Sequence, residues 1–176
     1  MNRSTIVAVT VCLALGGCSD DDASTDATAS TVAISDAALP IVEQIDDAIA
    51  ALEAEVGAPQ EYFEINATPL LVNLFVAAEL GTAVQAWVYL DGALTSEESQ
   101  PAQGGTFRRA NLDFDSATIF LHVQSELPGA AVESFYILGN GEGAVQYGAL
   151  LTTEQGGAID VQLSSDGQII SSEPLN

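Results

Sequence analysis

An internal repeat constrains the fold of this chain more than any other feature of its sequence. The segment 57–65 (GAPQEYFEI) aligns without gaps on 129–137 (GAAVESFYI) and shares five residues with it. Farther on, 81–94 (GTAVQAWVYLDGAL) aligns on 156–169 (GGAIDVQLSSDGQI), where an Asp-Gly pair recurs and the apolar positions stay apolar. Unless small residues align here by chance, the repeat predicts two copies of one supersecondary unit, neither of which is stable alone.

The first copy begins with the strongest helix signal in the chain, over residues 35–56. Ser35 or Asp36 would cap its start, Pro40 is tolerated in a first turn, and Gly57 is a natural stop. Apolar residues recur there at three- and four-residue steps and form one stripe: Val42, Ile45, Ile49, Leu52 and Val56. The pattern therefore predicts an amphipathic helix with one buried face.

Strand-like segments follow this helix. Apolar and polar residues alternate over 61–67, and two further β-rich runs cover 70–78 and 83–90. The last run leaves through Asp91-Gly92, a typical hairpin turn. These runs predict a three-stranded antiparallel meander.

The repeat also decides an ambiguous segment, 116–127 (SATIFLHVQSEL). Its β-branched content favours a strand, but its place in the repeat is that of the first helix. Asp113 or Asp115 could cap it, and its apolar residues also fall at helical spacing: Phe120, Val123 and Leu127. We therefore expect a helix here.

The expected fold class is α+β, with two repeats of one helix followed by a three-stranded antiparallel meander, whose sheets join or pack. The boundaries are 34–95 for the first unit, 96–111 for a linker and 112–176 for the second unit. This order of elements resembles the tandem PepSY-like and β-lactamase-inhibitor-protein-like domains of secreted bacterial proteins, over about residues 36–170. The resemblance implies binding to other proteins rather than chemistry, and it transfers no functional residue.

Residues 1–17 have the features of a signal peptide. Arg3 precedes an uncharged run over 5–15, which is too short to cross a bilayer, since that takes about 20 residues. The run ends in Leu15-Gly16-Gly17-Cys18, which resembles the bacterial lipobox. That resemblance implies cleavage between Gly17 and Cys18 and attachment of diacylglycerol to the Cys18 sulfur. An ordinary secretory signal followed by a chance cysteine is the alternative.

The cysteine count agrees with a lipid anchor. Cys12 lies in the segment to be removed, so Cys18 would be the one cysteine left, which excludes a disulfide or a thiol metal site. Ser19 follows it, where lipoproteins of the inner membrane usually carry aspartate. The expected location is therefore the outer membrane, on its periplasmic or surface face, in a two-membrane bacterium, and otherwise the outer face of the cytoplasmic membrane. The rest of 18–33 is small, polar and acidic, which predicts a disordered tether.

Charge excludes several kinds of partner. The chain has 25 Asp and Glu residues, no lysine and 3 arginines, for a formal net charge of −22. A protein needs clustered Lys and Arg residues to bind nucleic acids or anionic lipid surfaces, so we expect this chain to bind neither. We expect Arg108 and Arg109 to neutralise their own acidic surroundings, the alternative being that they dock an acidic partner.

The sequence predicts no catalytic residue, metal or cofactor. His122 is the single histidine, which argues against a Ser-His-Asp triad or a two-histidine metal site, and it would lie off the apolar stripe of its helix. The segment 139–143 (GNGEG) is similar to a nucleotide fingerprint, but it lies between two strands and predicts a hairpin loop. A pair of catalytic carboxylates remains an alternative that one sequence does not exclude.

One set of aromatic residues predicts a binding surface. If the strand residues Phe63, Ile65 and Val84 point beneath the helices, the opposite sheet face collects four aromatic side chains: Tyr62, Phe75, Trp87 and Tyr89. Coverage of this face by the second unit is the alternative. We expect a membrane-anchored, non-catalytic module, inhibitory or regulatory, that binds an unidentified envelope or extracellular protein. A structural envelope-maintenance lipoprotein and a carboxylate-dependent hydrolase are the alternatives.

Overall fold

The computed structural model describes residues 38–175. The predicted signal peptide, Cys18 and the acidic tether to residue 33 lie outside the described residues. The helical elements are η1 (Val42–Gln44), α1 (Ile45–Val56), η2 (Glu79–Gly81), η3 (Arg109–Asn111) and α2 (Leu121–Glu126). The strands are β1 (Tyr62–Ala67), β2 (Val72–Ala78), β3 (Ala83–Leu90), β4 (Ala93–Ser96), β5 (Gln100–Pro101), β6 (Ala131–Gly139), β7 (Val145–Thr152), β8 (Ala158–Leu163) and β9 (Ile169–Leu175). The α+β class is thus confirmed, and no helix in this part of the chain is long and apolar enough to cross a membrane.

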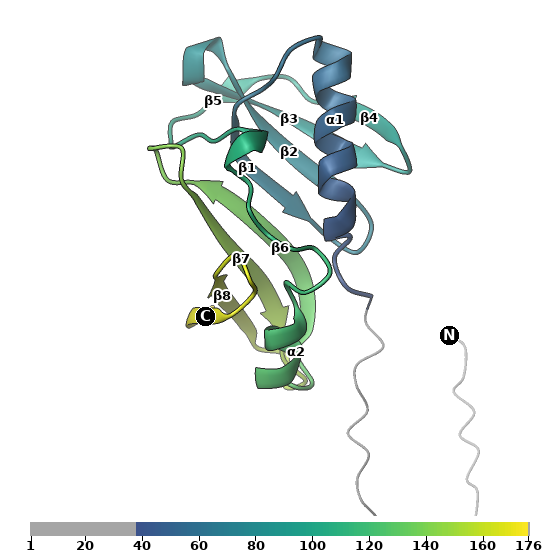
Figure 1. Cartoon of the computed structure of the whole chain (residues 1–176), viewed down its shortest axis with the longest axis vertical. Helices are drawn as coiled ribbons and strands as arrows, with labels where there is room; N and C mark the ends of the chain where they lie inside the picture. Colours follow the sequence, from purple (N-terminus) through teal and green to yellow (C-terminus); the bar gives the residue numbers. More distant parts are fainter. Residues whose placement is uncertain (1–37, 176) are drawn as a thin grey trace, which may run out of the picture. The chain divides into compact units, whose positions relative to one another are not determined.

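All nine strands form one antiparallel sheet, in the order β4-β3-β2-β1-β6-β7-β8-β9, with β5 paired to β3. The halves of the chain meet where β1 pairs with β6 and Ile65 lies opposite Ile137. Both isoleucines are fully buried, so the core lies on the same sheet face in both halves. Both α1 and α2 lie over this face (Figure 1). The sheets therefore join edge to edge.

Each half contributes a run of four strands rather than the predicted three. Asp91 and Gly92 both have positive φ, 50° and 80°, in the tight turn that sends the chain back from β3 into β4. At the corresponding place in the second half, Gly167 (φ 83°) lies in the turn from β8 into β9. Each Asp-Gly turn thus continues its meander by one further strand.

Helix α1 has the predicted end and most of the predicted stripe. Gly57 ends it in a left-handed conformation (φ 80°), and its N–H donates to the Glu53 carbonyl at 2.9 Å. The residues buried beneath η1 and α1 are Val42, Ile45, Ala48, Ile49 and Leu52. Val56, expected in the stripe, is 47% exposed. The described residues before Val42 are not helical, because the Ile41 N–H donates to the Thr68 carbonyl at 3.1 Å instead of continuing a helix.

Of the segment 116–127, where the repeat predicts a helix, only the second half is helical and forms α2. A turn precedes the helix, held by Asp115, whose side chain accepts from the Ala117 N–H at 2.9 Å. Ile119, Phe120 and Val123 are buried against the sheet. His122 is exposed on the other side of the helix, as expected.

The core of the second half is an aromatic cluster around Phe135, which is fully buried on β6. Its ring lies 5.3 Å from Phe114, 5.8 Å from Phe120 and 6.1 Å from Tyr147, measured between centroids. The same core continues into the first half beneath α1. One core therefore stabilises both halves.

The predicted aromatic face is wrong, because its four residues do not share an exposed surface. In β3, Trp87 pairs with Leu74 and Tyr89 pairs with Val72. Directly paired residues point to the same side of a sheet, so Trp87 and Tyr89 lie on the buried, helix-covered side with Leu74 and Val72.

The other two aromatic residues of that face lie on opposite sides of the sheet. A bulge between Tyr62 and Glu64 shifts the alternation of β1, and Tyr62 is fully buried in the core. Phe75 follows the buried Leu74 in β2 and therefore points to the side of the sheet opposite the helices. The predicted grouping thus fails for two reasons: the bulge turns Tyr62 into the core, and β3 presents its aromatic side chains to the helix-covered side rather than to the opposite one.

The predicted linker 96–111 is fixed to the sheet. Its Phe107 is buried and forms an antiparallel bridge with Tyr62, with N–H···O distances of 2.8 and 2.9 Å. Just before it, Gly105 packs against the 139–141 hairpin so closely that a Cβ on Gly105 would lie 2.0 Å from the Gly141 nitrogen. The linker therefore holds the residues that follow Phe107 in a defined place.

Candidate functional site

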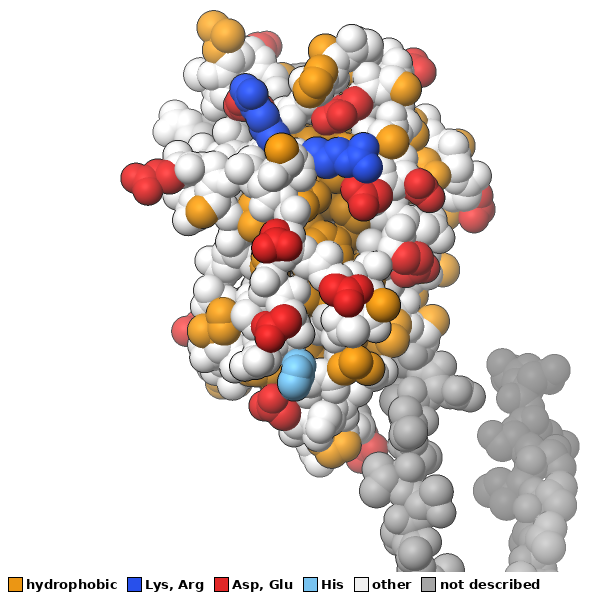
Figure 2. All heavy atoms as spheres, in the orientation of Figure 1, with side chains coloured by type: hydrophobic (Ala, Val, Ile, Leu, Met, Phe, Trp, Pro, Cys, Tyr) orange, Lys and Arg blue, Asp and Glu red, His pale blue; other side chains and the backbone are white. Residues whose placement is uncertain are grey.

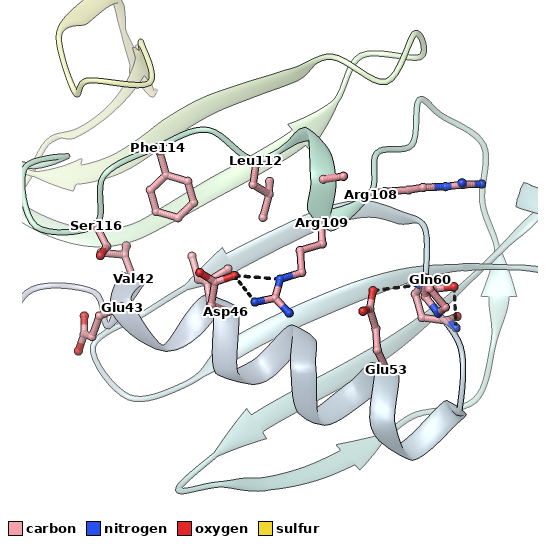
Figure 3. Close-up of a pocket in the computed structure, with 13 residues that line it drawn as sticks. Val42, Glu43, Asp46, Glu53, Gln60, Arg108, Arg109, Leu112, Phe114 and Ser116 are labelled. Atoms are coloured by element: carbon pink, nitrogen blue, oxygen red, sulfur yellow. Dashed lines mark hydrogen bonds and ion pairs between the residues drawn. The ribbon is translucent and has the colours of Figure 1, made fainter.

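A groove of about 570 Å³ separates η1 and α1 from the segment 108–116. Figure 3 shows this groove, with Val42 on one side and Leu112 and Phe114 on the other. Its apolar lining comes from both sides and from the loop after α1: Val42, Ile45, Pro59, Ala110, Leu112 and Phe114. In the space-filling view, hydrophobic surface lies in a hollow bordered by acidic side chains and one of the two cationic ones (Figure 2). The groove can thus accommodate an apolar side chain.

Carboxylates line the helix side of the groove at three points, Glu43, Asp46 and Glu53. Asp46 and Glu43 come from the exposed face of η1 and α1, opposite the residues that enter the core. Glu53, in the last turn of α1, accepts a hydrogen bond from the Gln60 N–H at 3.1 Å. The helix therefore presents an acidic edge beside an apolar floor.

Arg109 crosses the groove from η3 to α1 (Figure 3). Its Nη2 lies 3.0 Å and its Nε 3.2 Å from Asp46 Oδ1. The two side chains remain 46% and 72% exposed, so solvent screens this ion pair. This ion pair therefore connects the two walls of the groove through a weak contact, in which another cationic group could replace Arg109.

Arg108 points away from Arg109 and pairs with Glu61 at the start of β1. Its Nε donates to Glu61 Oε1 at 3.0 Å, and this bond, more than the arginine charge itself, lowers the pKa of Glu61 below its ordinary value. The Asn111 side chain fixes the local turn by accepting from the Arg108 N–H at 2.8 Å. Both arginines thus neutralise acidic neighbours, as expected from the sequence.

Tyr62 is the one residue of the predicted aromatic face that contacts a group in the groove. Its hydroxyl lies 3.4 Å from Glu53 Oε1, to which it donates. Burial raises the pKa of Tyr62 well above its ordinary value of 10.0, and the negative charge of Glu53 raises it further. Tyr62 is therefore a neutral donor that holds Glu53 in place rather than a surface for a partner.

The remaining predicted residues lie elsewhere. Phe75 lines a second hollow of about 310 Å³ on the sheet face opposite the helices, between the strand residues Phe63, Val84 and Leu138 and the linker segment 102–105. Trp87 and Tyr89 line neither hollow. The described residues contain no cluster of three or more His, Cys, Asp and Glu side chains that could hold a metal ion.

Sequence reasoning missed the groove because its walls lie more than 50 residues apart in the chain. A signal was nevertheless present, since Arg108 and Arg109 are the sole cationic residues after position 3. In a chain this acidic, they had to approach carboxylates. The sequence predicted the helix that supplies one of those carboxylates, Asp46, although with too early a start, and it did not predict that Arg109 is the partner of Asp46 across the groove.

The fold and groove define an α+β domain with a single antiparallel sheet, helices on one face and a groove on the helix side. No family model matches this chain, and no curated protein matches it. Among solved structures, the crystal structure of a Clostridium difficile 630 protein named "putative lipoprotein" is similar, with a TM-score of 0.49 and 12% identity. The match covers 80% of this chain and 95% of that chain. At this level of similarity the likeness carries no argument about the function of this chain.

Proposed function

We propose that this chain is an exported lipoprotein, anchored through diacylglycerol on Cys18, whose folded part binds another protein without catalysing a reaction. The observation that carries the anchor is the sequence Leu15-Gly16-Gly17-Cys18 at the end of a short apolar run. Cys18 is also the sole cysteine outside the predicted signal peptide, and acylation accounts for an unpaired exported cysteine. In a two-membrane bacterium, Ser19 favours the outer membrane.

We also propose that the fold arose from two copies of one helix-meander unit, which is the organisation that the PepSY-like resemblance implies. Support comes from the element order, since α1 precedes β1 to β4 and α2 precedes β6 to β9. Further support comes from Ile65 and Ile137, which are aligned in the sequence repeat and lie opposite each other at the centre of the sheet. Such a pairing is what a two-fold relation between two copies would produce.

The groove beside α1 is the surface that we propose for the partner, in place of the aromatic face. It combines an apolar floor with charged edges, a combination typical of protein recognition sites. The geometry favours binding over chemistry, because His122 does not line the groove and Glu53 is held by Gln60 and Tyr62.

Replacing Cys18 with serine is expected to abolish lipid attachment completely, because serine lacks the sulfur that carries the diacylglycerol. The measurement is incorporation of radiolabelled palmitate in a bacterial host, with membrane fractionation of the same cells. We expect no label in Cys18→Ser, retention of the uncleaved leader and loss of the mature form from the membrane.

Cys12→Ser is the matched control, because Cys12 lies inside the apolar run and has no role in the proposed attachment. This variant should incorporate label at the wild-type level. Equal labelling of the Cys18→Ser variant, or processing of that variant to the same mature length, would show that the anchor assignment is wrong.

A further inference from the structure

We propose that the groove binds a partner segment in which an apolar side chain is followed by Arg or Lys, and that Arg109 is an internal competitor for the same carboxylate. The inference rests on the proposed function and specifies the chemistry of the partner. The apolar side chain would enter between Ile45 and Phe114, and the cationic group would replace Arg109 on Asp46.

Charge complementarity selects a cationic partner. Twenty of the 25 Asp and Glu residues fall within 38–175, against two arginines. Both arginines are already paired, with Glu61 and with Asp46. The groove is lined by three carboxylates (Glu43, Asp46 and Glu53) and by both arginines. Since Arg108 pairs with Glu61 and Arg109 with Asp46, Glu43 and Glu53 have no arginine partner among residues 38–175, and the site carries an excess of negative charge. An acidic segment would be repelled by this field, whereas a basic one is attracted over a distance of about a Debye length.

The Arg109 contact has the properties of an exchangeable competitor. It is formed by two partly exposed side chains, it spans the groove, and it comes from a short turn rather than from a strand. A guanidinium or ammonium group from a partner could form the same contact with Asp46 while Arg109 turns toward solvent. Because one exposed pair replaces another, the exchange has a small cost.

The test uses the full chain, ¹⁵N-labelled and purified in neutral detergent, with three short peptides. The cationic probe is acetyl-Leu-Arg-Phe-Arg-amide, and its controls are the peptides with Glu or Gln in place of both Arg residues. Because the chain has 3 arginines, each Nε–H signal can be assigned with an Arg→Gln variant. We expect the cationic peptide to move the Arg109 signal in a saturable way, more than the Arg108 signal, and less strongly as salt is raised.

Two matched variants distinguish a specific contact with Asp46 from general electrostatic attraction to an acidic surface. Asp46→Asn should weaken binding of the cationic peptide, while Asp47→Asn, an exposed neighbour that does not line the groove, should leave it unchanged. Arg109→Gln should strengthen binding about two- to five-fold, the range expected for loss of one exposed ion pair.

The proposal is overturned if the cationic peptide leaves the Arg109 signal unmoved, or if Asp47→Asn weakens binding as much as Asp46→Asn. Equal binding of the Gln peptide would also reject the cationic partner but keep a binding groove. Lipid attachment at Cys18 is measured separately, so failure of the anchor is distinguishable from failure of the ligand chemistry.

Discussion

Replacing Phe135 with alanine is expected to reduce the free energy of unfolding by about 3–5 kcal/mol, the usual cost of removing a large buried aromatic side chain. Phe135 is fully buried and contacts the rings of Phe114, Phe120 and Tyr147. Its removal leaves a cavity at the place where the second half of the sheet meets α2 and the segment that lines the groove. Urea unfolding followed by fluorescence of Trp87, the one tryptophan, measures the change.

Leu121→Ala is the control for this experiment, because Leu121 lies on α2 but is 57% exposed. Its effect should stay within about 0.5 kcal/mol, as for most surface substitutions. A loss below about 1 kcal/mol for Phe135→Ala would mean that this aromatic cluster is not the core of the second half. Because Trp87 lies in the first half and Phe135 in the second, a shift of the Trp87 transition by Phe135→Ala would also show that the two halves unfold together.

Replacing Gly105 with alanine is expected to destabilise the protein by about 1–3 kcal/mol, the range for an overpacked site. The added Cβ would lie 2.0 Å from the Gly141 backbone nitrogen and 2.5 Å from the Asn140 carbonyl carbon. Backbone atoms cannot turn aside as a side chain can, so the linker must separate from the hairpin. Urea unfolding of the variant gives the free energy directly.

Gly104→Ala is a control one residue away. Its Cβ would meet only the Phe63 ring, at an ordinary contact distance of 3.5 Å, so the unfolding free energy should change little. Equal destabilisation by the two variants would show that the linker is not held by the close contact at Gly105. Because Phe107, Arg108 and Arg109 follow this contact, Gly105→Ala should also disturb the Arg109 Nε–H signal, which Gly104→Ala should leave in place.

Helix α1 and the turns of this protein were predictable because their signals are local. The stripe from Val42 to Leu52 indicates which side of α1 is buried, and Gly57 indicates where the helix ends. The place of 116–127 in the repeat predicts a helix where β-branched residues alone would indicate a strand. The decisive residues for α1 thus lie within the helix or next to it, whereas α2 was predicted from the alignment of two distant segments of the chain.

The side of the sheet to which each strand residue points was not predictable in the same way. In β3, apolar residues occupy both alternating sets, with Val84, Ala86 and Val88 on one and Trp87 and Tyr89 on the other. Alternation cannot choose between two apolar sets, and pairing with Leu74 and Val72 makes the choice in the folded protein.

The alternation of β1 depends on a bulge, and a bulge changes which residues share a face without leaving a clear sequence signal. The candidate site could not be predicted from the sequence for a related reason, since Asp46 and Arg109 become neighbours only through the tertiary fold. What the sequence did indicate was that each arginine would meet a carboxylate.

The central claim is that an acidic groove on a membrane-anchored protein contacts a cationic partner, and carbodiimide cross-linking in intact envelopes tests it most directly. This reagent joins carboxylates to amines, and because the chain has no lysine, cross-links from its side chains must reach another molecule or its own N-terminus. We predict cross-links concentrated on Glu43, Asp46 and Glu53, joined to lysines of one protein. Cross-links spread evenly over exposed carboxylates that do not line the groove, such as Glu126, Glu133 and Glu154, would contradict the account.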